Sequence, residues 1–235
     1  MEPKANPVLD TEAVDRAATD LAIAQEFVIN AESALIYRIT HRDNLPWILD
    51  NGLHCKSSQT TDPAYVDIGH PELIEKRSQH IVTGAPGGTL ADYVPFYFTP
   101  FSPMAYNIKT GRNGICKRGN AELVIVFSSL HNLQEANIPF LFTDRHAISA
   151  TQNYSDLTNL DQIDWPSLQQ RNFKKDDLER FKRYQAETLV HKHLPMDAAL
   201  GFVCYNDYTT SVLRANIEAR GLTIPVAKRP KWYFS

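Results

Sequence analysis

The chain has 235 residues, of which 43% are hydrophobic and 22% charged, and its formal net charge is −3. This composition excludes global disorder, and a chain of this length can bury a substantial core. No apolar run approaches the roughly 20 residues of a membrane span, and the N-terminus lacks the basic and apolar regions of a secretion signal. We therefore expect a cytoplasmic protein with no membrane partner. Three scattered cysteines are too few for a disulfide framework.

The N-terminal segment differs in charge from the rest of the chain. Residues 1–35 carry a net charge of −5, so the remaining residues sum to +2. Residues 10–30 are predicted to be a helix, whose apolar residues recur at helical spacing: Val14, Leu21, Ala24 and Val28. We interpret residues 1–33 as an acidic helical extension and residues 34–235 as the folded domain.

Strands and helices are intermixed along this domain. Strands are predicted over 34–40, 93–99, 122–127, 140–143, 187–191, 202–205 and 223–227. Helices are predicted over 43–51, 72–79, 165–171, 177–184 and 208–220. The order lacks regular βαβ alternation, which favours an α+β fold over a doubly wound sheet.

A long polar stretch, residues 150–186, interrupts the strand-rich part of the domain. Such connections inside a compact domain are usually binding loops or lids. Within it, residues 171–183 have a local net charge of +3. This run is either a solvated helix face or a contact for a phosphate backbone.

Common catalytic motifs are absent from the sequence. His54-Cys55 and His191-x-His193 are the only tight groups of soft metal ligands, and a third ligand at recognisable spacing is missing, so we expect no metal site. The sequence has no Gly-x-Ser-x-Gly elbow, and the glycines at 84–88 lack the lysine of a phosphate-binding loop.

Two charged residues stand inside apolar strands. Arg38 follows Tyr37 in the first predicted strand, and Glu187 begins 187–191. Period-two alternation places Gln185 and Glu187 on the same face of this strand. A buried, unpaired carboxylate costs several kcal/mol, so Glu187 is expected at a sheet edge, in an ion pair or in a cleft. A structural ion pair is the corresponding alternative for Arg38.

Six stretches of the chain, in matching order, resemble the DarT family of DNA ADP-ribosyltransferase toxins. They are 36–49 (IYRITHRDNLPWIL), 71–77 (PELIEKR), 92–104 (DYVPFYFTPFSPM), 139–144 (PFLFTD), 184–187 (YQAE) and 232–235 (WYFS). The resemblance runs from about residue 34 to the C-terminus. It implies an ADP-ribosyltransferase fold, with a split, strongly curved β core and peripheral helices.

The same resemblance implies an activity. ADP-ribose would pass from NAD to a base of single-stranded DNA, most commonly thymidine, with release of nicotinamide. It implies a cognate DarG-like macrodomain antitoxin as partner, and no metal. Alternatives are the same chemistry on RNA, on another base such as guanine or on protein, and a catalytically silent nucleic-acid-binding module.

The resemblance also assigns site residues. Glu187 and Arg77 match catalytic positions, and Arg77 would act on the NAD phosphates or on the acceptor base. The positions expected to bind NAD are Arg38, Ile39, Thr40, His41, Trp47 and Leu53. The segment 144–186 corresponds to the substrate-binding loop, and Gln185 belongs to a Gln-x-Glu pattern that ends at Glu187. Independently of the resemblance, the basic run supplies Arg171, Lys174 and Lys175 as expected contacts to DNA, and Tyr154 near it offers a ring on which a base can stack.

The chemistry agrees with these residue types. Breaking a nicotinamide–ribose bond develops oxocarbenium character, which a nearby carboxylate stabilises. The same carboxylate can accept a proton from an attacking ring nitrogen. Because a base inside a duplex is closed to such attack, single strands are the expected substrate.

Overall fold

The computed structural model of the protein describes residues 28–235. Most of the helix expected over 10–30, and most of the expected extension 1–33, lies outside this range. Residues 28–30, at the end of that expected helix, are not helical. Within the described residues, no helix combines the length and the apolar character that a membrane span requires.

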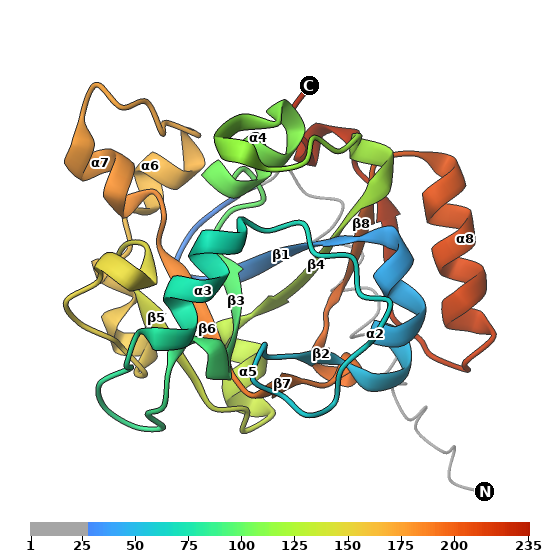
Figure 1. Ribbon diagram of the computed structural model, residues 1–235, viewed down its shortest axis with the longest axis horizontal. Helices are drawn as coiled ribbons and strands as arrows, with labels where there is room; N and C mark the ends of the chain where they lie inside the picture. Colours follow the sequence, from blue (N-terminus) through green and yellow to red (C-terminus); the bar gives the residue numbers. More distant parts are fainter. Residues whose placement is uncertain (1–27) are drawn as a thin grey trace, which may run out of the picture.

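The centre of the fold is a seven-stranded sheet in the order β5-β6-β3-β1-β4-β8-β9 (Figure 1). Its strands are β1 (Leu35–His41), β3 (Tyr93–Tyr97), β4 (Leu123–Ser129), β5 (Phe140–Thr143), β6 (Glu187–His191), β8 (Gly201–Cys204) and β9 (Val226–Lys228). The neighbours pair antiparallel, except that β8 and β9 are parallel. The sequence predicts all seven strands, with boundaries that differ by a few residues.

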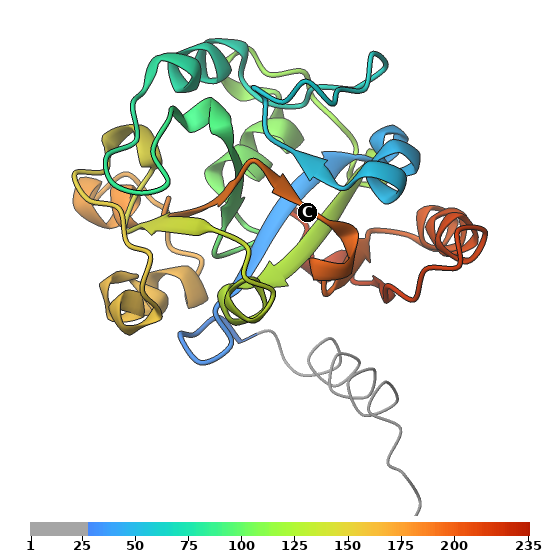
Figure 2. The same ribbon diagram turned by 90° about the horizontal axis from the view of Figure 1, so that it is seen from below.

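The sheet is split between β1 and β3. One residue pair, Tyr37 and Tyr97, is registered between these two strands, whereas β1 pairs with β4 along its whole length, from Leu35 to His41. The sheet therefore consists of two halves that meet at one point, and Figure 2 shows β5 and β6 on one side and β4 and α8 on the other. The expected α+β fold with a split sheet is confirmed.

Helices and a small second sheet surround this core. The helices are α2 (Leu45–Asn51), α3 (Pro71–Gln79), α4 (Pro103–Thr110), α5 (Leu130–Glu135), α6 (Trp165–Gln169), α7 (Leu178–Arg183) and α8 (Asp207–Glu218), and β2 (Leu53–His54) pairs with β7 (His193–Leu194). The sequence predicts neither α4 nor α5.

The largest core cluster lies on one face of the sheet. Thr188 and Val190 point to this face of β6, and Phe96, Phe142 and Val190 are fully buried there. Burial of each of these apolar side chains contributes about 2 kcal/mol. Because side chains alternate along a strand, Glu187 points to the other face. In Figure 1, α3 crosses in front of β1 and β3.

Candidate active site

Glu187 is fully buried, and three donors surround its carboxylate. Oε2 accepts a hydrogen bond from Arg77 Nη1 at 2.9 Å. Oε1 accepts from the backbone N–H of Ala147 at 3.3 Å, and His146 Nε2 lies 3.4 Å from the same oxygen. Because β6 lies between β5 and β3, the interpretation of Glu187 as an edge-strand residue is wrong, and its ion pair is confirmed.

The surroundings keep the Glu187 carboxylate ionised. Burial acts to raise the pKa of Glu187, but the charges of His146 and Arg77, with hydrogen bonds from Arg77 and the Ala147 N–H, hold this pKa below its ordinary value. Tyr97 stands directly opposite Glu187 on β3. Burial, and then the Glu187 charge, raise the pKa of Tyr97, so its phenol stays protonated.

Arg77 reaches the site from the last turn of α3. Pro71 occupies the first turn of this helix, where a missing N–H costs nothing, and the helix ends at Gln79. The Arg77 side chain is 12% exposed. Its Nη2 is buried and has no hydrogen-bond partner among the described residues. One guanidinium nitrogen therefore holds Glu187 while another remains free for a ligand.

Two adjoining cavities open beside this ion pair. The first has a volume of about 200 Å³ and is lined in part by Trp47, Leu53 and His54. The second, of about 630 Å³, is lined in part by His146 and Gln185. The two cavities share six lining residues, namely Arg38, Tyr65, Asp67, Ile74, Arg77 and Pro95. They form a continuous cleft with Arg38 and Arg77 at the junction.

Arg38 lies on β1 at this junction. Its Nη1 donates a hydrogen bond to the carbonyl oxygen of Pro95 at 2.9 Å. Its Nε is buried with no hydrogen-bond partner among residues 28–235, where Arg38 also has no carboxylate partner. The structural ion pair considered for Arg38 is therefore wrong within this range. Unused guanidinium donors suit an anionic ligand, because an unpaired buried donor is costly.

The other positions expected to bind NAD divide into two groups. Trp47 and Leu53 line the first cavity, and Ile39 lines the second. Thr40 and His41 are buried and line neither cavity. Thr40 accepts a hydrogen bond from Asn44 at 3.2 Å, and His41 Nε2 lies 3.7 Å from a carboxylate oxygen of Glu122. These two residues therefore support the turn after β1.

Gln185 and Tyr154 occupy different faces. Gln185 belongs to the turn between α7 and β6, so strand alternation does not extend to it, yet it lines the second cavity. Its side-chain amide donates to the Phe181 carbonyl oxygen at 3.1 Å. Tyr154 pairs with Phe142 beyond β5 and stacks on its ring, with centroids 5.5 Å apart. It lies on the core face and lines neither cavity.

The basic segment 171–183 divides into paired and unpaired cations. Lys182 lies 2.6 Å from a carboxylate oxygen of Glu179, and Arg180 bonds to Asp176. The exposed Lys174 and Lys175 have no ion-pair partner in the described part of the chain. The Arg171 guanidinium lies over the Phe101 ring, 3.7 Å from its centroid.

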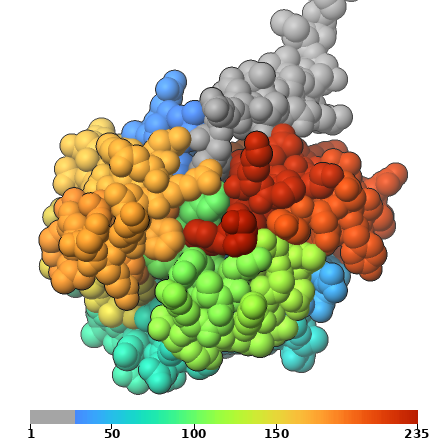
Figure 3. Space-filling model, turned by 90° about the horizontal axis from the view of Figure 1, so that it is seen from above, coloured from blue at the N-terminus to red at the C-terminus, as the bar shows by residue number. Residues whose placement is uncertain are grey.

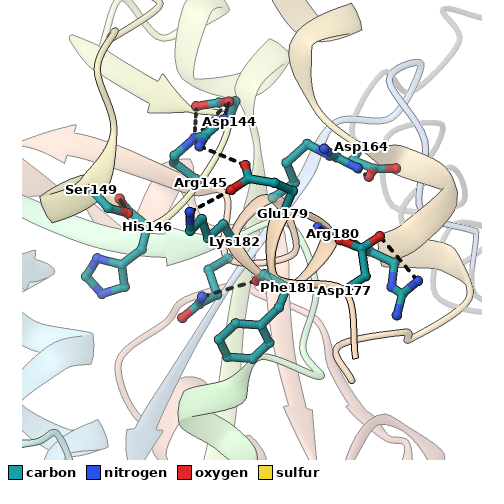
Figure 4. Close-up of polar contacts among 12 residues, drawn as sticks. Asp144, Arg145, His146, Ser149, Asp164, Asp177, Glu179, Arg180, Phe181 and Lys182 are labelled. Carbon is teal, nitrogen blue, oxygen red and sulfur yellow. Dashed lines mark hydrogen bonds and ion pairs between the residues drawn. The ribbon is translucent and has the colours of Figure 1, made fainter. Parts of the chain in front are cut away.

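Arg145 connects this segment to the loop that follows β5. It lies 2.8 Å from Asp144 and 3.5 Å from Glu179 of α7 (Figure 4). The imidazole of His146, the next residue along the loop, points away from this network. The loop is thereby held to α7, while His146 and Ala147 contact Glu187.

Several site residues escaped the sequence analysis. His146, Tyr97, Met104 and Asn107 line the second cavity. Tyr97 and Met104 fall within a stretch that resembles the family, but neither breaks a hydrophobic pattern as Glu187 does. His146 lies in a loop, where neither hydrophobic periodicity nor a sequence motif identifies a residue as part of the site. The identity of these residues as site components follows from the fold alone.

The candidate metal ligands are dispersed. His191 packs on Tyr93, with ring centroids 5.1 Å apart, whereas His193 packs on His54 at 4.3 Å. Across residues 28–235, no group of three or more histidine, cysteine, aspartate or glutamate side chains is placed to hold a metal ion.

Known proteins resemble this chain in sequence. The family model described as "ssDNA thymidine ADP-ribosyltransferase, DarT" matches residues 37–234. A DNA ADP-ribosyl transferase of Escherichia coli O127:H6 is 51% identical over 210 residues, which cover 88% of this chain and 96% of that protein. One from Thermus sp. strain 2.9 is 34% identical over 208 residues, covering 86% and 97%.

Solved structures resemble it in fold. Thermus sp. 2.9 DarT in complex with ADP-ribosylated ssDNA has a TM-score of 0.80 at 30% identity and covers 89% of this chain and 100% of that chain. Thermus sp. 2.9 DarT in complex with NAD+ has a TM-score of 0.73, also at 30% identity, and covers 86% and 98%.

Proposed function

The chain belongs to the DarT family of single-stranded DNA thymidine ADP-ribosyltransferases, and we propose how its own residues perform that reaction. The observation that carries the proposal is the buried Arg77–Glu187 pair beside the junction of two cavities. One cavity takes NAD and the other takes the thymine base, so the reacting atoms meet beside the Glu187 carboxylate.

NAD occupies the first cavity and its junction with the second. Trp47 and Leu53 offer apolar surface there, and Arg38 offers a buried Nε that lacks a partner among the described residues. A guanidinium suits the pyrophosphate of NAD because its donors are fixed in one plane. Bound NAD supplies an activated ribose carbon whose bond to nicotinamide breaks with oxocarbenium character. Thr40 and His41, which line neither cavity, support the turn after β1 instead.

Glu187 stabilises the developing cation and accepts the proton. As the C1–N bond of nicotinamide breaks, its electron pair leaves with nicotinamide and positive charge develops on the ribose. The ring nitrogen of thymine then forms the new bond to C1, and its proton passes to Glu187. The lowered pKa of Glu187 keeps the carboxylate charged for the first of these roles.

Arg77 positions both Glu187 and the ligand. Its Nη1 fixes one carboxylate oxygen, and Nη2 donates to the ligand at the cavity junction. His146 and the Ala147 N–H fix the second oxygen, so the carboxylate cannot rotate away. Such preorganisation lowers the barrier because no reorganisation is needed as charge develops.

The thymine base occupies the second cavity. Gln185, Asn107 and His146 offer polar groups around it, and Met104 offers apolar surface. Only an unstacked base can enter, which selects single-stranded DNA. Lys174 and Lys175 attract the strand, together with Arg171 above the Phe101 ring. The stacking of Tyr154 on Phe142 gives it a packing role instead.

Family membership also supports a cognate macrodomain antitoxin of the DarG type. In this account the enzyme acts in the cytoplasm as a toxin, and the antitoxin opposes it. Expression of the protein with and without a macrodomain partner, with cell growth as the readout, tests this part. Growth arrest that persists when the partner is present would contradict it.

Defined oligonucleotides test the reaction. The protein is incubated with NAD and a single strand that holds one thymidine, and the products are weighed by mass spectrometry. We expect the mass of one ADP-ribose on that strand, and none when cytidine replaces the thymidine, when the strand is paired or when RNA is offered. Modification of protein or of another base, with unmodified thymidine, would overturn the proposal.

A further inference from the structure

One wall of the second cavity continues into a strongly basic segment. Residues 103–119 contain Lys109, Arg112, Lys117 and Arg118 and no acidic residue, a local charge of +4. Arg118 lies 3.4 Å from Glu122. Arg112 and Lys117 are exposed and Lys109 is partly exposed, and none of the three has an ion-pair partner within residues 28–235.

This arrangement differs from an ordinary solvated helix surface. On α7, Arg180, Lys182 and Arg183 each contact a carboxylate, namely Asp176, Glu179 and Asp164 respectively. Positive charges that alternate with carboxylates in this way keep a surface soluble but produce only a weak electrostatic field. The unpaired cations around α4 instead form a field of one sign, which attracts an anionic polymer.

The unpaired cations lie beside the cleft. Met104 and Asn107 of α4, and Asn113 of the turn that follows, line the second cavity. Lys109, Arg112 and Lys117 belong to the same segment, 103–119, and line neither cavity. They therefore flank the place proposed for the thymine base and are not part of it.

Aromatic rings connect this wall to the other basic segment. The Arg112 guanidinium lies over the Tyr106 ring, 5.1 Å from its centroid. Tyr106 in turn contacts Phe173 at 5.8 Å and Phe234 at 5.4 Å. Figure 3 shows the region of α4, the region of α6 and α7 and the C-terminal residues on one face of the molecule. Basic residues thus border an aromatic cluster on two sides.

We propose that Lys109, Arg112 and Lys117 bind phosphates of the nucleotides next to the target thymidine, so that the strand leaves the second cavity across α4. This inference rests on the proposed function. A base held in the cavity remains covalently linked to its neighbours, and these must pass over its rim. Cations that lack carboxylate partners suit a phosphate backbone, and the neighbouring rings can stack on bases. The two features together fit a single strand better than an acidic protein.

The test compares strands of two lengths. One strand has about four nucleotides around a single thymidine and the other about twelve, a range that spans typical single-strand sites. Arg112→Gln/Lys117→Gln should raise the KM for the long strand about tenfold. It should also reduce the magnitude of the slope of log affinity against log salt by about 1.4, because two phosphate contacts to a single strand are lost. The KM for the short strand and the KM for NAD should stay unchanged.

A matched variant controls for net charge. Arg214→Gln/Lys228→Gln removes the same net charge from α8 and β9, where Lys228 pairs with Asp207 and Arg214 bonds to the Val226 carbonyl oxygen, and it should leave the values for both strands unchanged. Thermal melting checks that each variant folds. Equal values for the long strand in the parent and in Arg112→Gln/Lys117→Gln would overturn the inference. An equal loss on both strands would also overturn it, because the residues would then act at the reaction centre.

The same data separate this inference from the proposed function. If no strand is ADP-ribosylated by the parent protein, the proposed function is wrong. Binding of the long strand and its salt dependence, measured by fluorescence anisotropy without NAD, then still decide whether these residues bind single-stranded DNA.

Discussion

Arg77 and Glu187 are 110 residues apart in the sequence, and they form a buried ion pair at 2.9 Å between α3 and β6. Their side chains are 12% and 1% exposed, so solvent screens the pair weakly. A buried pair adds little net stability, but removal of one partner leaves an uncompensated charge. Stability alone therefore does not explain the pair, and we propose that it serves the chemistry at the cleft that Arg77 lines.

A double-mutant cycle tests this relationship. Arg77→Met should lower the free energy of unfolding by about 3 kcal/mol, because it leaves the Glu187 charge buried without its partner. Arg77→Met/Glu187→Leu should recover most of this loss while remaining inactive. Urea unfolding measures both effects. A double variant that is less stable than either single variant would contradict the interpretation.

The dependence of stability on pH tests the protonation state of Glu187. The pKa of Glu187 in the folded protein lies below its ordinary value of about 4.5, so the folded state binds fewer protons than the unfolded state near that pH. The stability that the pair contributes is present above this pH and is lost as the pH falls through the lowered pKa. The difference in unfolding free energy between the parent and Glu187→Gln should shrink on acidification. A difference that grows as the pH falls would mean that the pKa is raised.

The two cavities should respond differently to substitution. Trp47 lines the first cavity and Asn107 the second. We expect Trp47→Leu to raise the KM for NAD and Asn107→Ala to raise the KM for the oligonucleotide, each several-fold and with little effect on the other substrate. Steady-state kinetics with one substrate varied at a time measures this. The reverse pattern would mean that the cavities are assigned to the wrong substrates.

The cations of segment 171–183 should differ in their effect on DNA binding. Lys174→Gln/Lys175→Gln removes exposed charges that have no carboxylate partner in the described chain, so DNA affinity should fall and its salt dependence should weaken. Arg180→Gln/Lys182→Gln removes cations that already contact Asp176 and Glu179, and should have a smaller effect. Fluorescence anisotropy at several salt concentrations distinguishes the two variants. Equal losses of DNA affinity in the two variants would contradict the division into paired and unpaired cations.

Much of the fold could be predicted because the strands carry strong hydrophobic patterns. The seven strands of the main sheet are continuous apolar runs or β-branched segments, and Glu187 and Arg38 interrupt such runs. Hydrophobic periodicity does not indicate that α3 meets β6, because Arg77 lies on a polar helix with no buried residue. Only the family resemblance places Arg77 with Glu187 in the active site. Only the tertiary fold brings its guanidinium to Glu187.

Other features depend on local backbone geometry, which the periodicity of hydrophobic residues does not indicate. His146 contacts Glu187 from a loop, and Gln185 reaches the second cavity from a helical turn that replaces the strand assumed for it. Tyr154 is expected at the DNA because its ring, close to the basic run in sequence, could stack on a base. An isolated pairing with Phe142 draws it onto the core face instead.

The stoichiometry of nicotinamide release tests whether Glu187 performs the transfer. The parent protein and Glu187→Gln are each incubated with NAD and a single strand that holds one thymidine, and nicotinamide and modified DNA are quantified together. We expect one nicotinamide per modified thymidine in the parent. In Glu187→Gln we expect both products to fall by a factor of at least about 100, and Glu75→Gln, on the exposed surface of α3, is the control that should keep the parental rate. DNA modification by Glu187→Gln at the parental rate would contradict this role of Glu187.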